Sequence, residues 1–266
     1  MKILLNVFFK SSLFNKLSKF FGKKLIKYSK YFFVETKLKK LPLNNHPLKI
    51  NYKNEIKNLQ NFQFSKSFIP FVSYSHLIDL LEIYSNYKKN ILFFDYGAGN
   101  LHLYYLIKNK LKKFKYYYHD QKEYINLVKI IKNKNKLTNL IIAEKKTIKY
   151  LDFVYFGSVI QYLQNYKNEI KFFFKKTKYI IIAQSPFFTN YPKEKIIIKQ
   201  LNLFPTINYL YFINLDLLVN FMKKNNYILV NKSINKIIKF INFKNIDKKY
   251  KNMNMYDLVF KYEKKK

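Results

Sequence analysis

The sequence predicts an α/β fold built on a doubly wound, mostly parallel sheet. Short apolar runs alternate with segments of helical periodicity through the middle of the chain. Most of these runs are apolar throughout, as expected for parallel strands covered on both faces. Two of the four glycines lie in the turn after the first run. Open α/β sheets bind ligands at such turns, beyond the carboxyl ends of their strands.

The strand and helix segments follow one another from residue 74 onward. A helix is expected over residues 74–84, where Leu77, Leu80, Leu81 and Tyr84 share one face. The strands expected after it cover residues 91–95, 114–120, 140–143, 151–156 and 179–183. The helices expected between them cover residues 101–111, 122–132 and 161–174. Repeated units of this length imply right-handed crossovers between parallel strands.

The C-terminal part predicts one more helix and two strands. The helix covers residues 214–222, with Asn214 or a neighbour as its N-cap. The strands cover residues 226–230 and 255–262. The long connection between them suits an antiparallel pair at the edge of the sheet, which brings the expected number of strands to seven.

The chain divides into an arm with a connector, residues 1–60, and a main body, residues 61–266. Residues 8–33 alternate lysine with apolar residues at helical spacing. The favoured interpretation is a basic amphipathic helix packed on the main body, and the alternative is peripheral contact with an anionic membrane. No segment has the length of a transmembrane helix and no signal peptide is evident, so a cytoplasmic location is expected.

Composition excludes several chemistries. The chain has no cysteine, which rules out disulfides, thiolate metal sites and cysteine nucleophiles. The net charge of +36 comes from 51 lysines without any arginine. Lys, Asn, Ile, Phe and Tyr share AT-rich codons, so genome bias explains much of this charge and no specific nucleic acid is expected. Nonspecific attraction to anionic lipid or polymer still follows from the charge.

The turn after the first strand reads Asp95-Tyr96-Gly97-Ala98-Gly99-Asn100. Glycine accepts positive φ and allows a ligand to approach the backbone, and the helix that follows presents its N-terminus to that ligand. The turn therefore predicts a nucleotide-like cofactor, with an ordinary tight turn as the alternative. An acid two positions before the first glycine favours S-adenosylmethionine.

Two further features stand at the ends of later strands. His119-Asp120-Gln121 places an acid 21 residues after Gly99, where it can accept hydrogen bonds from both ribose hydroxyls. Its alternative role is as an N-cap for the next helix. Gly157-Ser158 brings the fourth strand to the same edge. A nicotinamide dehydrogenase more often has a third glycine where this chain has His102, which counts against that class.

From about residue 68, these segments resemble the class I S-adenosylmethionine-dependent methyltransferases. They resemble more closely a bacterial methyltransferase family associated with surface-polysaccharide genes. The resemblance extends to Gly157-Ser158-Val159-Ile160-Gln161-Tyr162-Leu163 and to Ser185-Pro186-Phe187-Phe188. It implies a Rossmann-like sheet, a methyl-donor site at residues 95–100 and Asp120, and an acceptor pocket built from later loops. Leu101 departs from the pattern, because many methyltransferases have a third glycine there.

The sequence thus predicts two sets of site residues. Those expected to bind the cofactor are Asp95, Tyr96, Gly97, Ala98, Gly99, Asn100, His119, Asp120, Gln121, Gly157 and Ser158. Those expected to line the acceptor pocket are Gln161, Tyr162, Gln184 and Ser185. No general base can be assigned, and a structural role for Asp152 competes evenly with a catalytic one. No cluster has metal-ligand spacing, so no metal is expected.

The function predicted is methyl transfer from S-adenosylmethionine, with a sugar or polysaccharide precursor as the acceptor by family analogy alone. Three alternatives stay open. One is a nicotinamide-dependent oxidoreductase, and another is a noncatalytic binding protein that keeps the fold. The third is a basic RNA-binding methyltransferase, which predicts steeply salt-dependent RNA binding but lacks a base-stacking motif.

Overall fold

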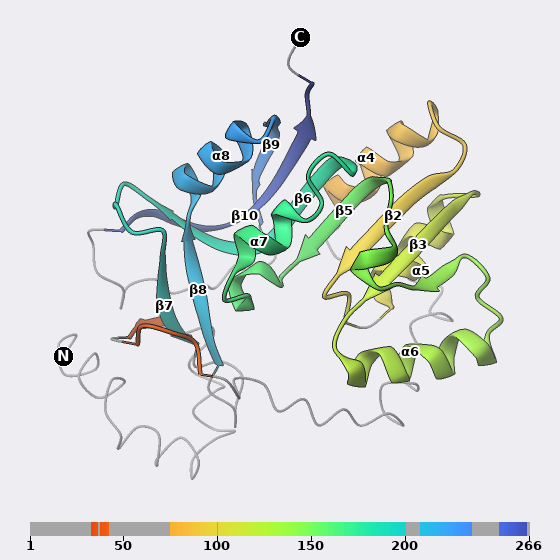
Figure 1. Cartoon of the computed structure of the whole chain (residues 1–266), viewed down its shortest axis with the longest axis horizontal. Helices are drawn as coiled ribbons and strands as arrows, with labels where there is room; N and C mark the ends of the chain where they lie inside the picture. Colours follow the sequence, from red (N-terminus) through yellow and green to blue (C-terminus); the bar gives the residue numbers. More distant parts are fainter. Residues whose placement is uncertain are drawn as a thin grey trace.

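The computed structural model describes residues 33–36, 38–42, 75–99, 101–200, 208–235 and 250–264. In this part of the chain, helices pack on both faces of a ten-stranded sheet (Figure 1). Asn100, most of the connector, and residues 8–32 of the expected arm helix lie outside the described residues, and Phe33, the expected end of that helix, begins a strand, β1 (Phe33–Glu35).

Seven strands form the predicted doubly wound sheet, in the order β4-β3-β2-β5-β6-β10-β9. The pairings among β2 to β6 are parallel, whereas β10 runs antiparallel to both β6 and β9. The Rossmann-like fold class and the antiparallel C-terminal pair are therefore confirmed. The strands are β2 (Ile91–Tyr96), β3 (Phe114–His119), β4 (Leu140–Ile142), β5 (Leu151–Gly157), β6 (Thr177–Thr189), β9 (Tyr227–Ile234) and β10 (Lys251–Tyr262).

Alternate residues of the central strands face two separate cores. Phe93 of β2 packs with α4 (Ser75–Ser85), α5 (His102–Lys110) and α6 (Lys122–Lys134) on one side. Its neighbour Phe94 packs with α7 (Tyr166–Lys171) and α8 (Leu215–Lys224) on the other. Because both faces are covered, the six residues of β5 from Leu151 to Phe156 are all buried. This double covering explains why the strands read as continuous apolar runs.

The single helix expected over residues 161–174 is wrong. The chain forms a 3₁₀ turn, η3 (Ile160–Tyr162), then an extended residue at Leu163, and only then α7. The side chain of Gln161 in η3 is buried and hydrogen-bonded to two serines, which fixes the turn and stops a continuous helix. The cap predicted for α8 is confirmed, since Asn214 Oδ1 accepts the Leu217 N–H at 3.1 Å.

Three strands that the sequence did not predict extend the sheet. β8 (Asn208–Asn214) pairs in parallel with the far end of β6, β7 (Lys195–Gln200) pairs antiparallel with β8, and β1 (Phe33–Glu35) pairs antiparallel with β7. β6 supports them because it continues six residues beyond its expected end at Ala183. A third apolar cluster, which includes Phe188 and Phe212, fills the extension.

Asp152 has a structural role at the amino edge of the sheet. Its side chain is fully buried and accepts hydrogen bonds from Tyr84 Oη at 3.1 Å, Lys88 Nζ at 2.7 Å and the Leu92 N–H at 2.8 Å. The carboxylate therefore fastens the end of α4 and the start of β2 to β5, away from the edge where parallel strands end.

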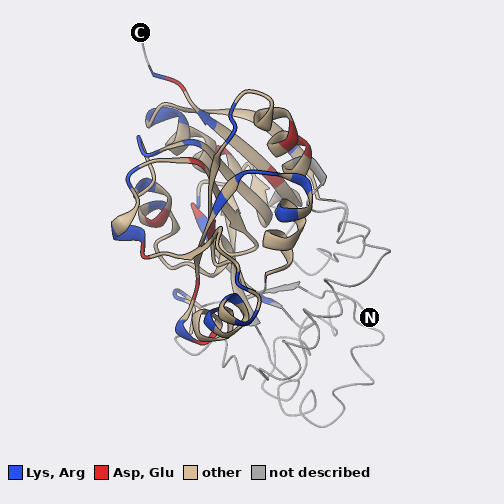
Figure 2. Cartoon of the chain, turned by 90° about the vertical axis from the view of Figure 1, so that its right-hand side faces the viewer, with Lys and Arg blue, Asp and Glu red and all other residues tan. Residues whose placement is uncertain are grey.

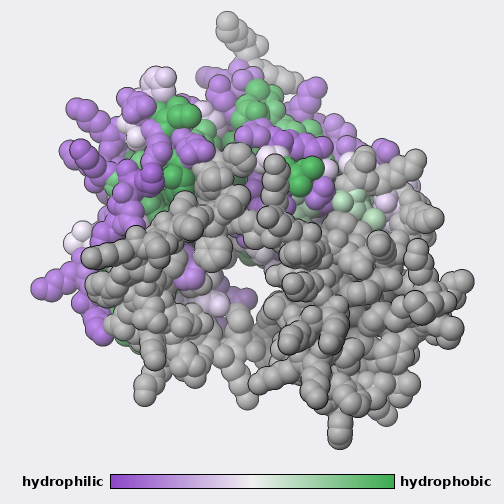
Figure 3. Space-filling model, turned by 180° about the vertical axis from the view of Figure 1, so that it is seen from behind, coloured by the Kyte–Doolittle hydropathy of each residue, from purple (hydrophilic) through white to green (hydrophobic). Residues whose placement is uncertain are grey.

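The surface of the described residues is mainly hydrophilic when seen from behind, with small apolar patches (Figure 3). In the described part of the chain, no helix is both long enough and apolar enough to cross a bilayer.

Candidate functional site

The candidate site lies at the carboxyl ends of β2, β3 and β5 (Figure 1). The chain proceeds from β2 to β3 and β4 on one side, and then returns to place β5 on the other side of β2. Open α/β sheets bind their ligands at such a reversal, in the crevice beyond the carboxyl ends of the strands.

The turn after β2 depends on its two glycines. Gly97 has φ +69° and Gly99 has φ +58°, both in the left-handed region. A Cβ on Gly97 would lie 2.5 Å from Val159 Cγ2, whereas a Cβ on Gly99 would meet no atom within 4 Å. Gly97 is therefore required for packing against the segment after β5. Gly99 instead leaves its backbone open to the crevice.

Asp120, at the end of β3, braces this turn. Its Oδ2 accepts the Gly99 N–H at 2.5 Å and its Oδ1 accepts the Gln121 N–H at 2.6 Å. Burial raises the pKa of Asp120, and these two N–H donors partly oppose the rise. Gln121, rather than Asp120, occupies the N-cap position of α6. Each carboxylate oxygen has a second lone pair, so Asp120 can accept further hydrogen bonds from a ligand.

The other acid of the turn, Asp95, lies beneath it. Its side chain is only 2% exposed, and its Oδ2 accepts a hydrogen bond from the Tyr116 hydroxyl. Burial raises the pKa of Asp95 to about 7, although the Tyr116 bond opposes the rise. Two residues further along β3, the Tyr118 hydroxyl donates to the Gly99 carbonyl at 2.5 Å. The two tyrosines support the turn from below, and the sequence analysis missed both.

Three predicted residues meet on the β5 side of the crevice. Gln161 Nε2 donates to Ser158 Oγ at 2.9 Å, and Ser185 Oγ donates to Gln161 Oε1 at 3.0 Å. Gln161 and Ser185 are buried, so they position Ser158 from behind. Tyr162 and Gln184 are partly exposed, as are Gly157 and Ser158 at the strand tip.

The backbone is strained at this point. Ser158 has φ +53° and Gln184 has φ +52°, a conformation that costs a non-glycine residue about 1 kcal/mol and recurs at functional sites. Gln184 lies where the register between β6 and β10 shifts, and Asp257 Oδ1 accepts its N–H at 2.7 Å. Asn235 Nδ2 donates to the same carboxylate at 3.0 Å and 3.1 Å. The bulge turns Ser185 toward Gln161, and no sequence signal identified Asp257.

A second polar cluster adjoins the turn on the α7 side. The Tyr96 hydroxyl donates to Glu169 Oε2 at 2.8 Å, and Lys145 Nζ donates to the same oxygen. Burial raises the pKa of Glu169, but the bonds from Lys145 and Tyr96 outweigh it, so the net direction is downward. The His119 ring lies 5.0 Å from the Tyr96 ring, and its Nδ1 is 3.2 Å from the Ala143 carbonyl. Glu169 and Lys145 were not predicted, because they come from α7 and from η2 (Lys145–Thr147).

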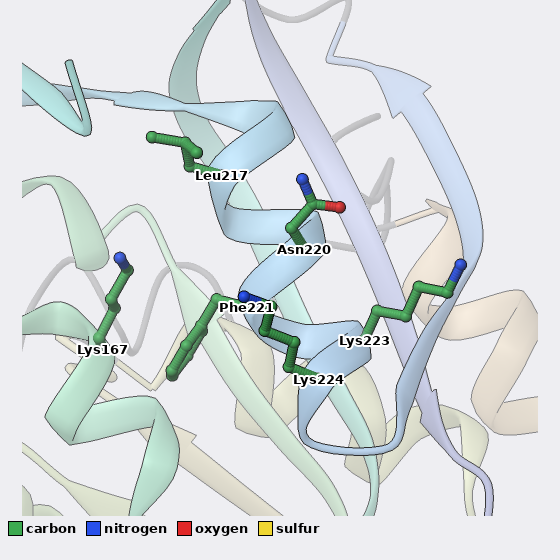
Figure 4. Close-up of a pocket in the computed structure, with 6 residues that line it drawn as sticks. All are labelled: Lys167, Leu217, Asn220, Phe221, Lys223 and Lys224. Carbon is green, nitrogen blue, oxygen red and sulfur yellow. The ribbon is translucent and has the colours of Figure 1, made fainter. Parts of the chain in front are cut away.

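A separate hollow of about 610 Å³ lies between α7 and α8 (Figure 4). The Lys167 ammonium and the Phe221 ring face each other across it, with 5.5 Å between Nζ and the ring centroid. Lys167 is already paired with Glu194 at 2.8 Å. None of the predicted site residues lines this hollow. Among the described residues, no three His, Asp or Glu side chains form a metal-binding group, and the absence of a metal stays a prediction.

No protein-family model matches the sequence, and no curated protein matches it. Similar solved structures include an S-adenosylmethionine-dependent methyltransferase from Clostridium acetobutylicum, at 10% identity over 80% of this chain and 100% of that one, with a TM-score of 0.49. Another is 1,6-didemethyltoxoflavin-N1-methyltransferase from Burkholderia thailandensis, at 9% identity over 82% of this chain and 93% of that one, with a TM-score of 0.46. Magnesium protoporphyrin IX methyltransferase from Synechocystis PCC 6803 is 10% identical over 98% of this chain and 97% of that one, with a TM-score of 0.45. Because these TM-scores are below 0.5, the fold assignment rests on the strand order of this chain.

Proposed function

We propose that the chain is an S-adenosylmethionine-dependent methyltransferase. The observation that carries the proposal is the turn after β2, whose two glycines have positive φ and whose Gly99 faces open space. The Asp120 carboxylate from β3 lies against that turn at the switch point of the sheet. A nucleoside with an attached chain fits such a cradle, because the exposed backbone allows close approach and the acid receives ribose hydroxyls.

The residues present fit the donor in a definite way. Asp120 would keep one oxygen on the Gly99 N–H and would accept the ribose hydroxyls with its remaining lone pairs. Gly99 and Ala98 would border the donor's chain with main-chain atoms, and Ser158 would border it from the β5 side. S-adenosylmethionine supplies a methyl group on a sulfonium, and in-line displacement from it requires chiefly that the acceptor be oriented.

For the acceptor, we propose a hydroxyl-rich compound such as a sugar or polysaccharide precursor. Ser158, directly after β5, and Gln184, in the neighbouring strand β6, are partly exposed and offer a hydroxyl and an amide group. Tyr162 and Gln164 follow Ser158 in the chain and are also at least partly exposed, and the Gln164 amide oxygen accepts the Tyr211 hydroxyl of β8 at 2.8 Å. Donors and acceptors fixed in this way can match the alternating groups of a polyhydroxylated ligand.

Calorimetric titration with S-adenosylmethionine, S-adenosylhomocysteine and NADH tests the donor. We expect binding of the first two and none of NADH, and the reverse result would favour the oxidoreductase alternative. Asp120→Ala should weaken donor binding by about 2 to 3 kcal/mol, or roughly 30- to 150-fold. Asp120→Asn keeps an acceptor for the Gly99 N–H and should lose less, while Asp79→Ala, at an exposed position on α4, is the matched control.

Methyl transfer from labelled donor to a panel of sugar nucleotides and glycans tests turnover. Labelled product in one or more of them supports the acceptor class. Donor binding without product over the whole panel would favour the noncatalytic alternative.

A further inference from the structure

A second hollow lies at the amino edge of the sheet, at the opposite ends of the strands from the candidate site. It has a volume of about 900 Å³ and thirteen lining residues, none of which is acidic. Six of the thirteen are lysines, and all six are exposed. We call them the amino-edge lysines: Lys89, Lys108, Lys112, Lys113, Lys115 and Lys136.

The topology brings these lysines together. β2, β3 and β4 are adjacent and parallel, so the loops that lead into them meet at one edge. Lys89 precedes β2, Lys112 and Lys113 precede β3, and Lys136 follows α6 on the way to β4. Figure 2 views the molecule from the side on which these strands lie, with lysines in blue. Three segments distant in sequence therefore contribute charge to a single concave surface.

General lysine richness does not account for this concentration. Lysine makes up six of the eight exposed residues that line the hollow, compared with 21 of the 51 exposed residues in the described part of the chain. None of the amino-edge lysines forms an ion pair with a described residue. The acids nearby are paired with other lysines, Asp152 with Lys88 and Glu82 with Lys110. The hollow therefore carries six positive charges that no described residue offsets, and a polyanion would relieve their mutual repulsion.

We propose that this hollow binds the phosphodiester backbone of RNA without reading its sequence. Lysine offers point charges to phosphates but lacks the rigid fork by which arginine reads bases. Neutral donors are also present, because the Asn139 amide oxygen accepts the Tyr104 hydroxyl at 2.6 Å and its NH₂ group remains available to a ligand. Leu111, Phe114 and Leu137 are at most 5% exposed, so these side chains have little surface to insert into a bilayer. A concave, charged surface of this kind suits a polyanionic chain better than a membrane.

The proposal is independent of the methyl donor site, since the two sites occupy opposite edges of the sheet. It is tested by fluorescence anisotropy with a short labelled single-stranded RNA of mixed sequence, between about 0.05 and 0.5 M salt. The test variant is Lys112→Gln/Lys113→Gln/Lys136→Gln. The matched control is Lys129→Gln/Lys171→Gln/Lys193→Gln, which removes the same charge at exposed positions outside the hollow.

Each phosphate contact contributes about 0.7 to the slope of log affinity against log salt for a single strand. The test variant should therefore lose about 2 from that slope and bind roughly 100-fold more weakly at about 0.1 M salt. The control should change affinity only a few-fold, and circular dichroism should show both variants folded. Equal losses in the two variants would overturn the proposal in favour of diffuse attraction. Binding of the wild type to phosphatidylserine vesicles but not to RNA would overturn it in favour of a membrane.

Discussion

Replacing Gly97 by alanine should destabilise the fold more than replacing Gly99 does. Both have positive φ, so each substitution costs about 1 to 2 kcal/mol of backbone strain. At Gly97 the new Cβ would also lie 2.5 Å from Val159 Cγ2 and 3.0 Å from its Cβ. Overpacking of this kind adds about 1 to 3 kcal/mol. We therefore expect Gly97→Ala to lower the free energy of unfolding by about 2 to 5 kcal/mol, and Gly99→Ala by only about 1 to 2.

Donor binding should show the reverse order of sensitivity. A methyl group on Gly99 enters the open space that we assign to the ligand, so Gly99→Ala should reduce donor affinity at least about tenfold. Urea unfolding measures the first quantity and calorimetric titration the second. A double variant, Gly97→Ala/Val159→Ala, should recover about 1 to 2 kcal/mol relative to Gly97→Ala, because the overlapping side chain is shortened. Equal destabilisation by the two alanines, or unchanged donor affinity in Gly99→Ala, would refute the reasoning.

Three further predictions concern carboxylates that accept hydrogen bonds within the fold, Asp95, Asp152 and Asp257. The pKa of Asp95 is about 7 in the folded protein, compared with 3.8 ordinarily. Between about pH 4 and 7, the folded protein therefore keeps a proton on Asp95 that the unfolded chain has already released. Stability should therefore fall by up to about 4 kcal/mol as pH rises through that window, and urea titrations of Asp95→Asn should show a shallower fall. Asp152→Ala should lower the free energy of unfolding in urea by about 3 to 5 kcal/mol, because it leaves Lys88, the Tyr84 hydroxyl and the Leu92 N–H without their acceptor. A loss no larger than that of the exposed Asp79→Ala would contradict the anchoring role. Asp257→Ala should lower the free energy of unfolding by about 1 to 3 kcal/mol, because the Gln184 N–H loses its acceptor. Calorimetric melting should show a smaller loss for Asp257→Asn, which keeps one acceptor oxygen.

Much of the site could be predicted because it follows local rules. A glycine pair after an apolar strand predicts a turn with positive φ, and Gly97 and Gly99 have that geometry. Asp120 ends the next strand, and the parallel pairing of β2 with β3 places it at the same edge. The sequence pattern is sufficient here, because strand direction alone decides which strand ends are neighbours.

The other residues of the site could not be predicted, because they are brought together by contacts between segments that are distant in sequence. Glu169 and Lys145 reach Tyr96 from α7 and from the loop after β4, and no spacing along the chain connects them. The same holds for Asp257, which supports a bulge 73 residues earlier. From the sequence, a structural and a catalytic role for Asp152 were equally well supported. The three donors that bind its carboxylate at the amino edge of the sheet show the structural role.

Local patterns in the sequence predict the strand-turn-helix order at β2, the turn that contains Gly97 and Gly99, and the acid that follows β3, because backbone conformation and burial pattern are properties of neighbouring residues. Three other features follow from tertiary packing: Asp95 lies under the turn, Gln161 and Ser185 support Ser158 from behind, and β6 extends far enough to pair with β8. Burial and side-chain pairing depend on which segments pack together, and that information is distributed over the whole chain.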